Sequence, residues 1–166
     1  VTQRSRERPT VAPVVTGSTP TPDRPLPLDG QRMEGWLCGQ ADALGACAAV
    51  VALLSDDGTA LEPRWSIGYP EEVVHSWRRI EVSERTPLVD ALHGEPVIIG
   101  SVAELEARYP LMAVRPTSGF ACCVAVAVPG RAGRPVGVLG LSFNELEPEL
   151  TPARARRAAS QLARHL

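Results

Sequence analysis

The sequence predicts an α+β fold, in which helices cover an antiparallel sheet. Two observations lead to this prediction. Apolar segments of strand length follow one another in pairs that are joined by hairpin turns, and strands joined in this way run antiparallel. Amphipathic helical patterns lie at the two ends of the region instead of alternating with the strands, which favours α+β over α/β.

Four apolar segments are predicted to form the long strands. The dipeptide Asp57-Gly58 is a strong hairpin signal between the first two segments. Residues 129–135, rich in Gly and Pro, form the predicted hairpin loop between the last two. The first segment is also bounded by turn signals, which indicates a buried strand. The four predicted strands are residues 46–55, 60–67, 120–128 and 136–143.

Two longer helices are predicted at the start and the end of the domain. Asp29 can cap the first helix and Gly45 can end it, while Thr151 with Pro152 can start the last one. Apolar residues recur at helical spacing in both segments. These stripes are Met33, Leu37, Ala41 and Leu44 in the first helix, and Ala155, Ala159, Leu162 and Leu166 in the last.

Shorter elements are predicted between the two hairpins. Ser101 and Glu104 form a capping box that starts one helix, and Pro87 opens another directly after Thr86. Residues 110–119 contain two Pro and one Gly and are predicted to form a loop. Further short helices and strands are predicted at residues 71–79, 80–82, 87–92 and 96–100.

Composition argues against several classes of protein. The chain has 166 residues and a formal net charge of −2, so no positive charge excess indicates nucleic-acid or membrane binding. No apolar run approaches the roughly 20 residues that a membrane-spanning helix needs. Residues 1–28, rich in Pro and Thr, are predicted to be a disordered tail. We therefore expect a soluble, cytoplasmic protein with one domain at residues 29–166.

The cysteines follow neither a metal-binding nor a disulfide pattern. Cys122 and Cys123 are adjacent in the stretch FACCVAVAVP, residues 120–129, and neighbouring residues of a strand point to opposite faces. They therefore cannot reach the same metal or substrate, and buried Cys is usually inert. We expect a structural role and no metal site, and the sequence does not tell which of the two thiols would face a pocket.

Five short motifs occur in order along residues 30–166. They are Ile67-Gly68-Tyr69, Thr86-Pro87-Leu88, Gly94-Glu95-Pro96-Val97, Ala125-Val126-Ala127-Val128-Pro129 and Val136-Gly137-Val138-Leu139. Together with the order of the predicted elements, these motifs resemble those of GAF domains, the small-molecule-sensing relatives of PAS. The sequences of these motifs are most similar to those of GAF modules of actinobacteria.

The resemblance implies a central antiparallel sheet of five or six strands. The first and last helices would pack on one face, and short helices and loops would cover a ligand pocket on the other. It also implies a non-catalytic sensory or regulatory module that binds a small molecule and signals through its outer helices or a partner protein. Such modules accompany kinases, phosphatases or transcription factors. The resemblance does not identify the ligand, which has to be inferred from the residues of the site.

Several GAF subtypes have signatures that this sequence lacks. The Asn-Lys-Phe-Asp-Glu signature of the cyclic-nucleotide type is absent, since the chain contains no Lys, and the Asp-Ile-Pro stretch of the bilin type is absent too. A haem ligand is not expected, because His75 is predicted to be exposed and His93 and His165 lie at helix ends. We expect no obligatory cofactor.

The resemblance would gather the large side chains of the middle of the domain around the pocket. Arg115 and Ser118, in the loop before Phe120, are the polar residues best placed to contact a ligand, and Arg115 could bind an anion. The candidate ligand-binding residues are Trp65, Tyr69, Tyr109, Met112, Arg115, Ser118, Phe120, Cys122 and Cys123.

A homodimer is the second expectation. The Ala and Leu stripe of the last helix would pack on the first helix, and surplus apolar surface would form a parallel bundle, the usual GAF signalling geometry. The residues expected in these helices are Met33, Leu37, Leu44, Ala155, Ala159, Leu162 and Leu166.

Two alternatives to a sensory module stay open. The GAF-type free methionine sulfoxide reductase uses a reactive Cys in a loop over the pocket, and residues 110–119 contain none. A thiol redox enzyme would therefore have to use Cys122 or Cys123. The other alternative is a degenerate GAF domain that acts only in dimerisation.

Overall fold

The computed structural model describes residues 29–114, 119–145 and 150–166. The predicted tail, residues 1–28, lies outside the described residues. In the described part of the chain the strands are β1 (Ala48–Leu54), β2 (Ala60–Ile67), β3 (Ile80–Glu81), β4 (Val97–Ile99), β5 (Cys122–Pro129) and β6 (Pro135–Phe143). The α-helices are α1 (Gly30–Leu44), α2 (Glu71–Ser76), α3 (Pro87–His93), α4 (Val102–Arg108), α5 (Pro110–Val114) and α6 (Pro152–Leu162), and a short 3-10 helix, η1 (Arg131–Gly133), lies between β5 and β6.

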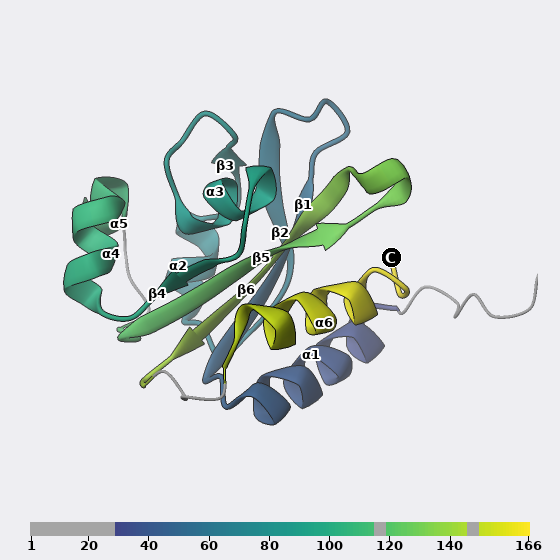
Figure 1. Cartoon of the computed structure of the whole chain (residues 1–166), viewed down its shortest axis with the longest axis horizontal. Helices are drawn as coiled ribbons and strands as arrows, with labels where there is room; N and C mark the ends of the chain where they lie inside the picture. Colours follow the sequence, from purple (N-terminus) through teal and green to yellow (C-terminus); the bar gives the residue numbers. More distant parts are fainter. Residues whose placement is uncertain (1–28, 115–118, 146–149) are drawn as a thin grey trace, which may run out of the picture.

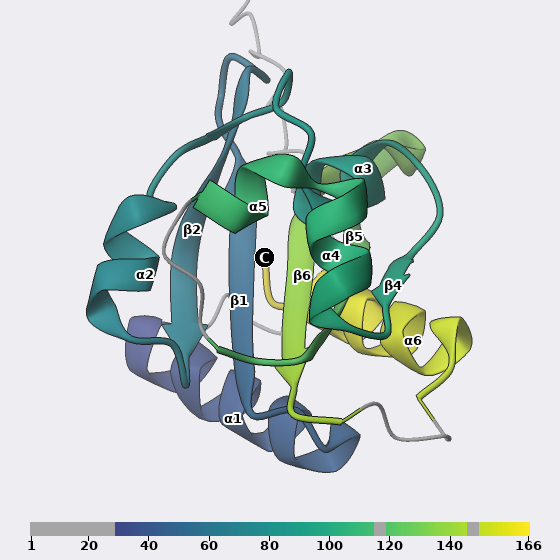
Figure 2. The same cartoon turned by 90° about the vertical axis from the view of Figure 1, so that its left-hand side faces the viewer.

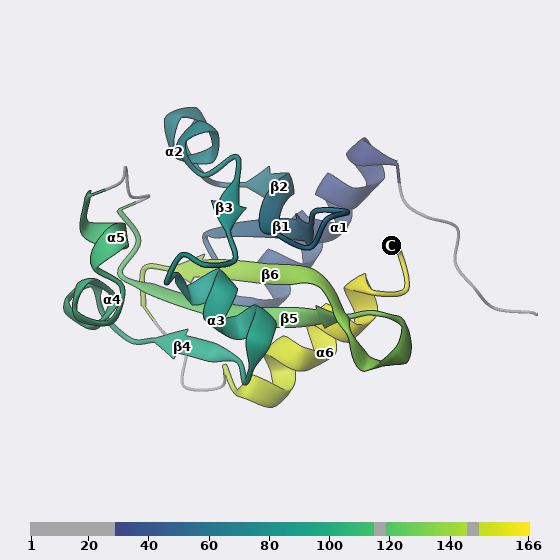
Figure 3. The same ribbon diagram turned by 90° about the horizontal axis from the view of Figure 1, so that it is seen from above.

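The strands form one six-stranded antiparallel sheet in the order β3-β2-β1-β6-β5-β4. Helices α1 and α6 lie on one face of the sheet, and α2 to α5 lie on the other (Figures 1 and 2). Seen from above, β2, β1, β6, β5 and β4 follow one another across the sheet (Figure 3). The predicted α+β class and the predicted layers are confirmed.

Local sequence signals explain where the helices begin and end. Oδ1 of Asp29 accepts a hydrogen bond from the Arg32 backbone N–H at 2.9 Å, which caps α1. Gly45 ends α1 in the left-handed region, with φ of 71°. The hydroxyl of Thr151 accepts from the Arg154 backbone N–H and caps α6. These three caps were all predicted from the residue types.

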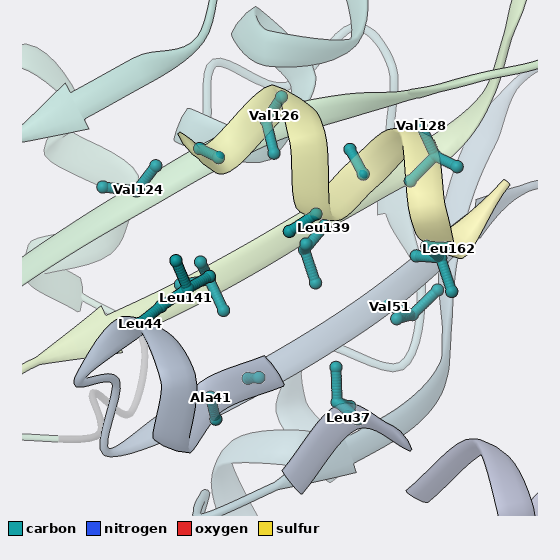
Figure 4. Close-up of a cluster of buried hydrophobic side chains, with 14 of the residues drawn as sticks. Leu37, Ala41, Leu44, Val51, Val124, Val126, Val128, Leu139, Leu141 and Leu162 are labelled. Carbon is teal, nitrogen blue, oxygen red and sulfur yellow. The ribbon is translucent and has the colours of Figure 1, made fainter. Parts of the chain in front are cut away.

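The helix-side core lies between the sheet and the two outer helices. Figure 4 shows side chains of α1 and α6 that point toward β1, β5 and β6. Burial of one Leu or Val side chain contributes roughly 1.5–3 kcal/mol, so this layer is a major source of stability. Its central members are Leu37, Ala41, Leu44, Val51, Val124, Val126, Val128, Leu139, Leu141 and Leu162.

One predicted element is wrong. Residues 110–114 of the predicted loop 110–119 form the short helix α5. Pro110 opens this helix, where a missing backbone N–H costs nothing, and the Met112 N–H donates to the Tyr109 carbonyl at 2.8 Å. Pro110 is therefore a helix start and not a loop signal.

Among the described residues, none of the helices combines the length and the hydropathy needed to cross a bilayer.

Candidate functional site

A cavity of about 140 Å³ lies on the sheet face opposite α1 and α6. The sheet contributes the floor, and the four helices α2, α3, α4 and α5 each contribute at least one side chain to the walls. Its apolar lining includes Val50, Pro63, Val73, Val74, Trp77, Ile80, Pro87, Leu88, Ile99, Leu105, Met112, Phe120, Ala121, Val124, Ala125 and Leu141. The position of this cavity is the one that the GAF resemblance implies.

The described lining of the cavity carries no charged side chain. It includes no Asp, Glu, Arg or His. The lining residues with polar side-chain groups are Ser66, Tyr69, Trp77, Thr86 and Ser142, together with Cys123, whose thiol faces the cavity. The Thr86 hydroxyl already accepts a hydrogen bond from the Val89 backbone N–H at 3.2 Å, which caps α3. A ligand would therefore meet mainly apolar surface with a few hydroxyl groups.

Tyr69 and Ser142 form the main polar pair of the cavity. The two hydroxyl oxygens are 2.8 Å apart, and either of them can be the donor. Burial raises the pKa of Tyr69 to about 12, against the opposing effect of the hydrogen bond with Ser142. Tyr69 is therefore neutral at physiological pH, and it offers a hydroxyl rather than a phenolate.

Gly68 explains how Tyr69 reaches this position. Its φ is 73°, and a Cβ atom there would lie 2.2 Å from the Cys47 carbonyl oxygen. Only glycine fits both the left-handed backbone and this close approach. The chain can therefore turn sharply after β2 and place the Tyr69 side chain in the cavity wall.

Cys122 and Cys123 point to opposite faces of the sheet, as predicted. Cys122 belongs to the helix-side core, and its Sγ donates to the Gly100 carbonyl at 3.3 Å. Cys123 faces the cavity, where it is paired in register with Ser142 of β6. Burial raises the pKa of the Cys123 thiol to about 12, with smaller contributions from Cys122 and Glu104. At neutral pH this thiol is protonated, and a protonated thiol is a poor nucleophile.

Tyr109 supports the wall of the cavity without lining it. Its ring is fully buried, and its hydroxyl donates to a carboxylate oxygen of Asp90 at 2.9 Å. The guanidinium of Arg108 lies 5.4 Å from the ring centroid. Burial, followed by the hydrogen bond to Asp90, raises the pKa of Tyr109 to about 12. This contact fixes the end of α4 to α3.

The structure brings together part of the candidate ligand set. Tyr69, Met112, Phe120, Cys122 and Cys123 line the cavity, although the Cys122 side chain packs in the opposite layer. The rings of Tyr69 and Phe120 form an edge-to-face pair with centroids 5.9 Å apart.

Three other positions of that set do not enter the described lining. Tyr109 is buried in the hydrophobic cluster on the cavity side of the sheet, but it does not line the cavity. Arg115 and Ser118 lie outside the described residues.

Trp65 corrects the candidate set, because it lies on the other face of the sheet. The register of β1 and β2 shifts between Val51 and Ala52, which pair with Trp65 and Pro63. This bulge adds one residue to β2, so that Pro63 faces the cavity while Trp65 packs against the helix-side core. Pro63 inside a strand was the available sequence signal for the bulge.

Most of the lining residues were absent from the candidate set, among them three with hydroxyl groups. Ser142 sits in an otherwise apolar strand, and a polar residue on the buried face of such a strand was the available signal. Thr86 and Leu88 belong to the motif Thr86-Pro87-Leu88, which indicated the family resemblance but not a place in the lining. Ser66, in the middle of β2, gave no such signal.

Most of the residues expected to form the dimer contact are buried within the protomer itself. Met33, Leu37 and Leu162 are fully buried against the sheet, and the same core includes Leu44, Ala155 and Ala159. Leu166 is only partly buried. The homodimer stays a prediction, and its contacts would have to come from the exposed sides of α1 and α6.

The described residues contain no group of three or more His, Cys, Asp or Glu side chains that could hold a metal ion. His75 and His93 are exposed, as predicted for His75. His165 is partly buried beside Trp36, on the side of the sheet opposite the cavity.

Comparison with known proteins gave results at the level of structure alone. No family model matches the sequence, and no curated protein matches it either. The GAF domain of a phosphoenolpyruvate-protein phosphotransferase from Acinetobacter is 17% identical, with a TM-score of 0.60, and the match covers 78% of this chain and 76% of that one.

Two further solved structures are similar. The type II free methionine-R-sulfoxide reductase of Thermoplasma acidophilum is 13% identical, with a TM-score of 0.63 and coverage of 81% and 89%. NreA of Staphylococcus aureus, mutated in its nitrate-binding site, is 14% identical, with a TM-score of 0.61 and coverage of 78% and 99%. Likeness at these identities establishes the fold, and the chain accordingly has a GAF-like fold.

Proposed function

We propose that this chain is a non-catalytic sensory or regulatory module whose cavity binds a small molecule. The observation that carries the proposal is the cavity of about 140 Å³ on the sheet face opposite α1 and α6, whose described lining carries no charge. A cavity of this kind, with few convergent polar groups, is the default binding site of a domain. Structural neighbours that include GAF domains and a nitrate-binding protein support it.

The architecture suggests how binding could be signalled. The cavity walls come from α2 to α5, which are short and each contribute one or two lining side chains. A ligand that fits one packing of these helices better than another shifts the population toward that packing. Strand β5 has its other face against α6, so the same strand contacts both the ligand and an outer helix. We propose that α6, or a partner protein bound to it, carries the output.

A thiol reductase is the second candidate, because two of the structural neighbours are free methionine-R-sulfoxide reductases. In the described part of the cavity, Cys123 is the thiol whose side chain faces the ligand space. Its raised pKa leaves almost no thiolate at neutral pH, which argues against a nucleophilic role. We therefore expect no reduction of free methionine sulfoxide by the wild-type protein in the presence of dithiothreitol.

Native mass spectrometry of the protein purified from its source organism tests the proposal. We expect a retained mass on the wild-type protein and none on the Ala125→Leu variant, because Ala125 lines the cavity. The matched control is Ala127→Leu, which makes the same change two residues along β5 at a position outside the lining. Equal retention by all three proteins, or an empty wild type that also rejects every added probe, would argue against a binding module.

A further inference from the structure

We propose that the cavity takes a neutral one-ring aromatic compound that carries a single hydroxyl group. This inference rests on the proposed function, since it names the ligand class of the same site. Four features of the cavity lead to it: its volume, the lack of charge in its described lining, its aromatic walls and its pair of hydroxyl groups.

The volume sets the size of the ligand. The cavity measures about 140 Å³, and an apolar protein cavity of about 150 Å³ is large enough to bind benzene. One six-membered ring with a small substituent therefore fills it. Nucleotides, bilins and haem are several times larger and would require the walls to move apart.

The lining determines the charge of the ligand. An ionised group that is buried without a partner is strongly disfavoured, because it loses its hydration and gains no opposite charge. No described lining residue carries a charge, and the nearby Asp90 carboxylate is already bonded to the Tyr109 hydroxyl. The cavity therefore favours a neutral molecule over a carboxylate or an ammonium of the same size.

The walls favour a ring over an aliphatic chain. Tyr69 and Phe120 present an edge-to-face pair at 79°, and Trp77 and Met112 also line the cavity. Aromatic rings gain extra stabilisation from edge-to-face and offset contacts with other rings, and from contact with a thioether sulfur. A flat ring can use both kinds of contact.

The Tyr69–Ser142 pair provides the anchor for one hydroxyl group. A hydroxyl has one donor hydrogen and two acceptor lone pairs. Whichever oxygen donates across the 2.8 Å bond, the other hydroxyl keeps its own hydrogen and can donate it to a ligand. A ligand hydroxyl can accept this hydrogen and donate to a free lone pair, whereas a carboxylate can only accept.

Isothermal titration calorimetry with three matched probes tests the inference. The probes are phenol, toluene and benzoate at pH 7.5, which share one ring and differ in the hydroxyl and in charge. We expect phenol to bind, toluene to bind about five- to tenfold more weakly for want of one hydrogen bond, and benzoate to show no binding. In the double variant Tyr69→Phe/Ser142→Ala, which removes both hydroxyl groups, the difference between phenol and toluene should fall to less than about threefold.

Cavity-filling variants show where the probes bind. Ala125→Leu and, as a second variant on the same face, Cys123→Leu should abolish phenol binding, while Ala127→Leu should bind like the wild type. Circular dichroism of each variant shows whether it is folded. If either Ala125→Leu or Cys123→Leu is unfolded, the other serves as the cavity-filling variant.

The outcomes separate the two claims. Binding of benzoate that equals or exceeds that of phenol, and that Ala125→Leu removes, would overturn the ligand class while leaving a binding module in place. Equal affinity for phenol and toluene would overturn the hydroxyl anchor. A wild-type protein that binds none of the three probes, and that also retains no mass from its source organism, would overturn both the ligand class and the proposed function.

Discussion

The hydroxyl oxygen of Tyr69 lies 2.8 Å from Oγ of Ser142, a residue 73 positions further along the chain. Tyr69 follows β2, and Ser142 lies in β6 beside Cys123 of β5. The contact therefore joins one wall of the cavity to its floor, across a sheet in which β1 separates the two strands. It also supplies two of the four hydroxyl groups in the described lining of a mainly apolar site.

A double-mutant cycle measures this contact. Tyr69→Phe or Ser142→Ala alone leaves the other hydroxyl without its partner, so each should lower the free energy of unfolding by about 1 kcal/mol. The double variant removes both groups and should lose clearly less than the sum of the two single changes. Urea unfolding curves provide the three values, and strictly additive losses would show that the two hydroxyls do not interact.

Thiol reactivity should divide the four cysteines into two pairs. Cys38 and Cys47 are exposed, whereas Cys122 is buried and Cys123 is partly buried. The pKa of Cys123 is raised from 9.0 to about 12, which lowers its thiolate fraction at pH 8 by on the order of a thousandfold. Peptide mass spectrometry after iodoacetamide treatment should find rapid labelling at Cys38 and Cys47 alone. Rapid labelling of Cys123 would contradict this prediction and would favour the reductase alternative.

Two glycines with almost the same backbone angle should respond differently to alanine. Gly68 and Gly58 have φ of 73° and 71°, so alanine costs roughly 1–2 kcal/mol at either position from backbone strain alone. A Cβ at Gly68 would also lie 2.2 Å from the Cys47 carbonyl oxygen, whereas nothing lies within 4 Å at Gly58. Gly68→Ala should therefore lower the melting temperature several degrees more than Gly58→Ala. Similar values for the two variants would contradict the close approach of the chain at Gly68.

The Tyr109–Asp90 hydrogen bond should contribute to stability in a pH-dependent way. Tyr109→Phe removes a bond to a carboxylate, and such bonds contribute about 1.5–3 kcal/mol. The pKa of Tyr109 is raised from 10.0 to about 12 in the folded chain, so its contribution is complete below pH 10 and is lost as the pH rises toward 12. Urea unfolding at pH 7 and pH 11 should therefore show a smaller effect of the substitution at the higher pH. An effect of equal size at both would refute this assignment.

Much of the fold follows from local signals in the sequence. Asp57 illustrates why, because its Oδ1 accepts from the Ser55 hydroxyl and from both the N–H and the hydroxyl of Thr59. These bonds lie within a few residues, and they lower the pKa of Asp57 to about 2. A turn that is specified by its own side chains can be predicted without knowledge of the rest of the chain.

The site was harder to predict because it depends on register. The alternation in β5 separated Cys122 from Cys123 correctly, but only the packing of α1 and α6 on the Cys122 side shows that Cys123 faces the cavity. One extra residue in β2 moved Trp65 out of the site. The pairing of Ser142 with Tyr69 connects two segments far apart in sequence, and no local pattern encodes it.

The central claim is that the sheet face bearing Cys123 and Ser142 encloses space for a small molecule. The most direct test is a crystal structure of the wild-type protein under xenon pressure, since apolar cavities of this size take up xenon. We predict electron density for xenon, or for a retained molecule, between Phe120, Cys123 and Ser142, and its loss in Ala125→Leu. A wild-type crystal in which protein side chains fill this space, with no density for xenon or a ligand, would contradict the claim.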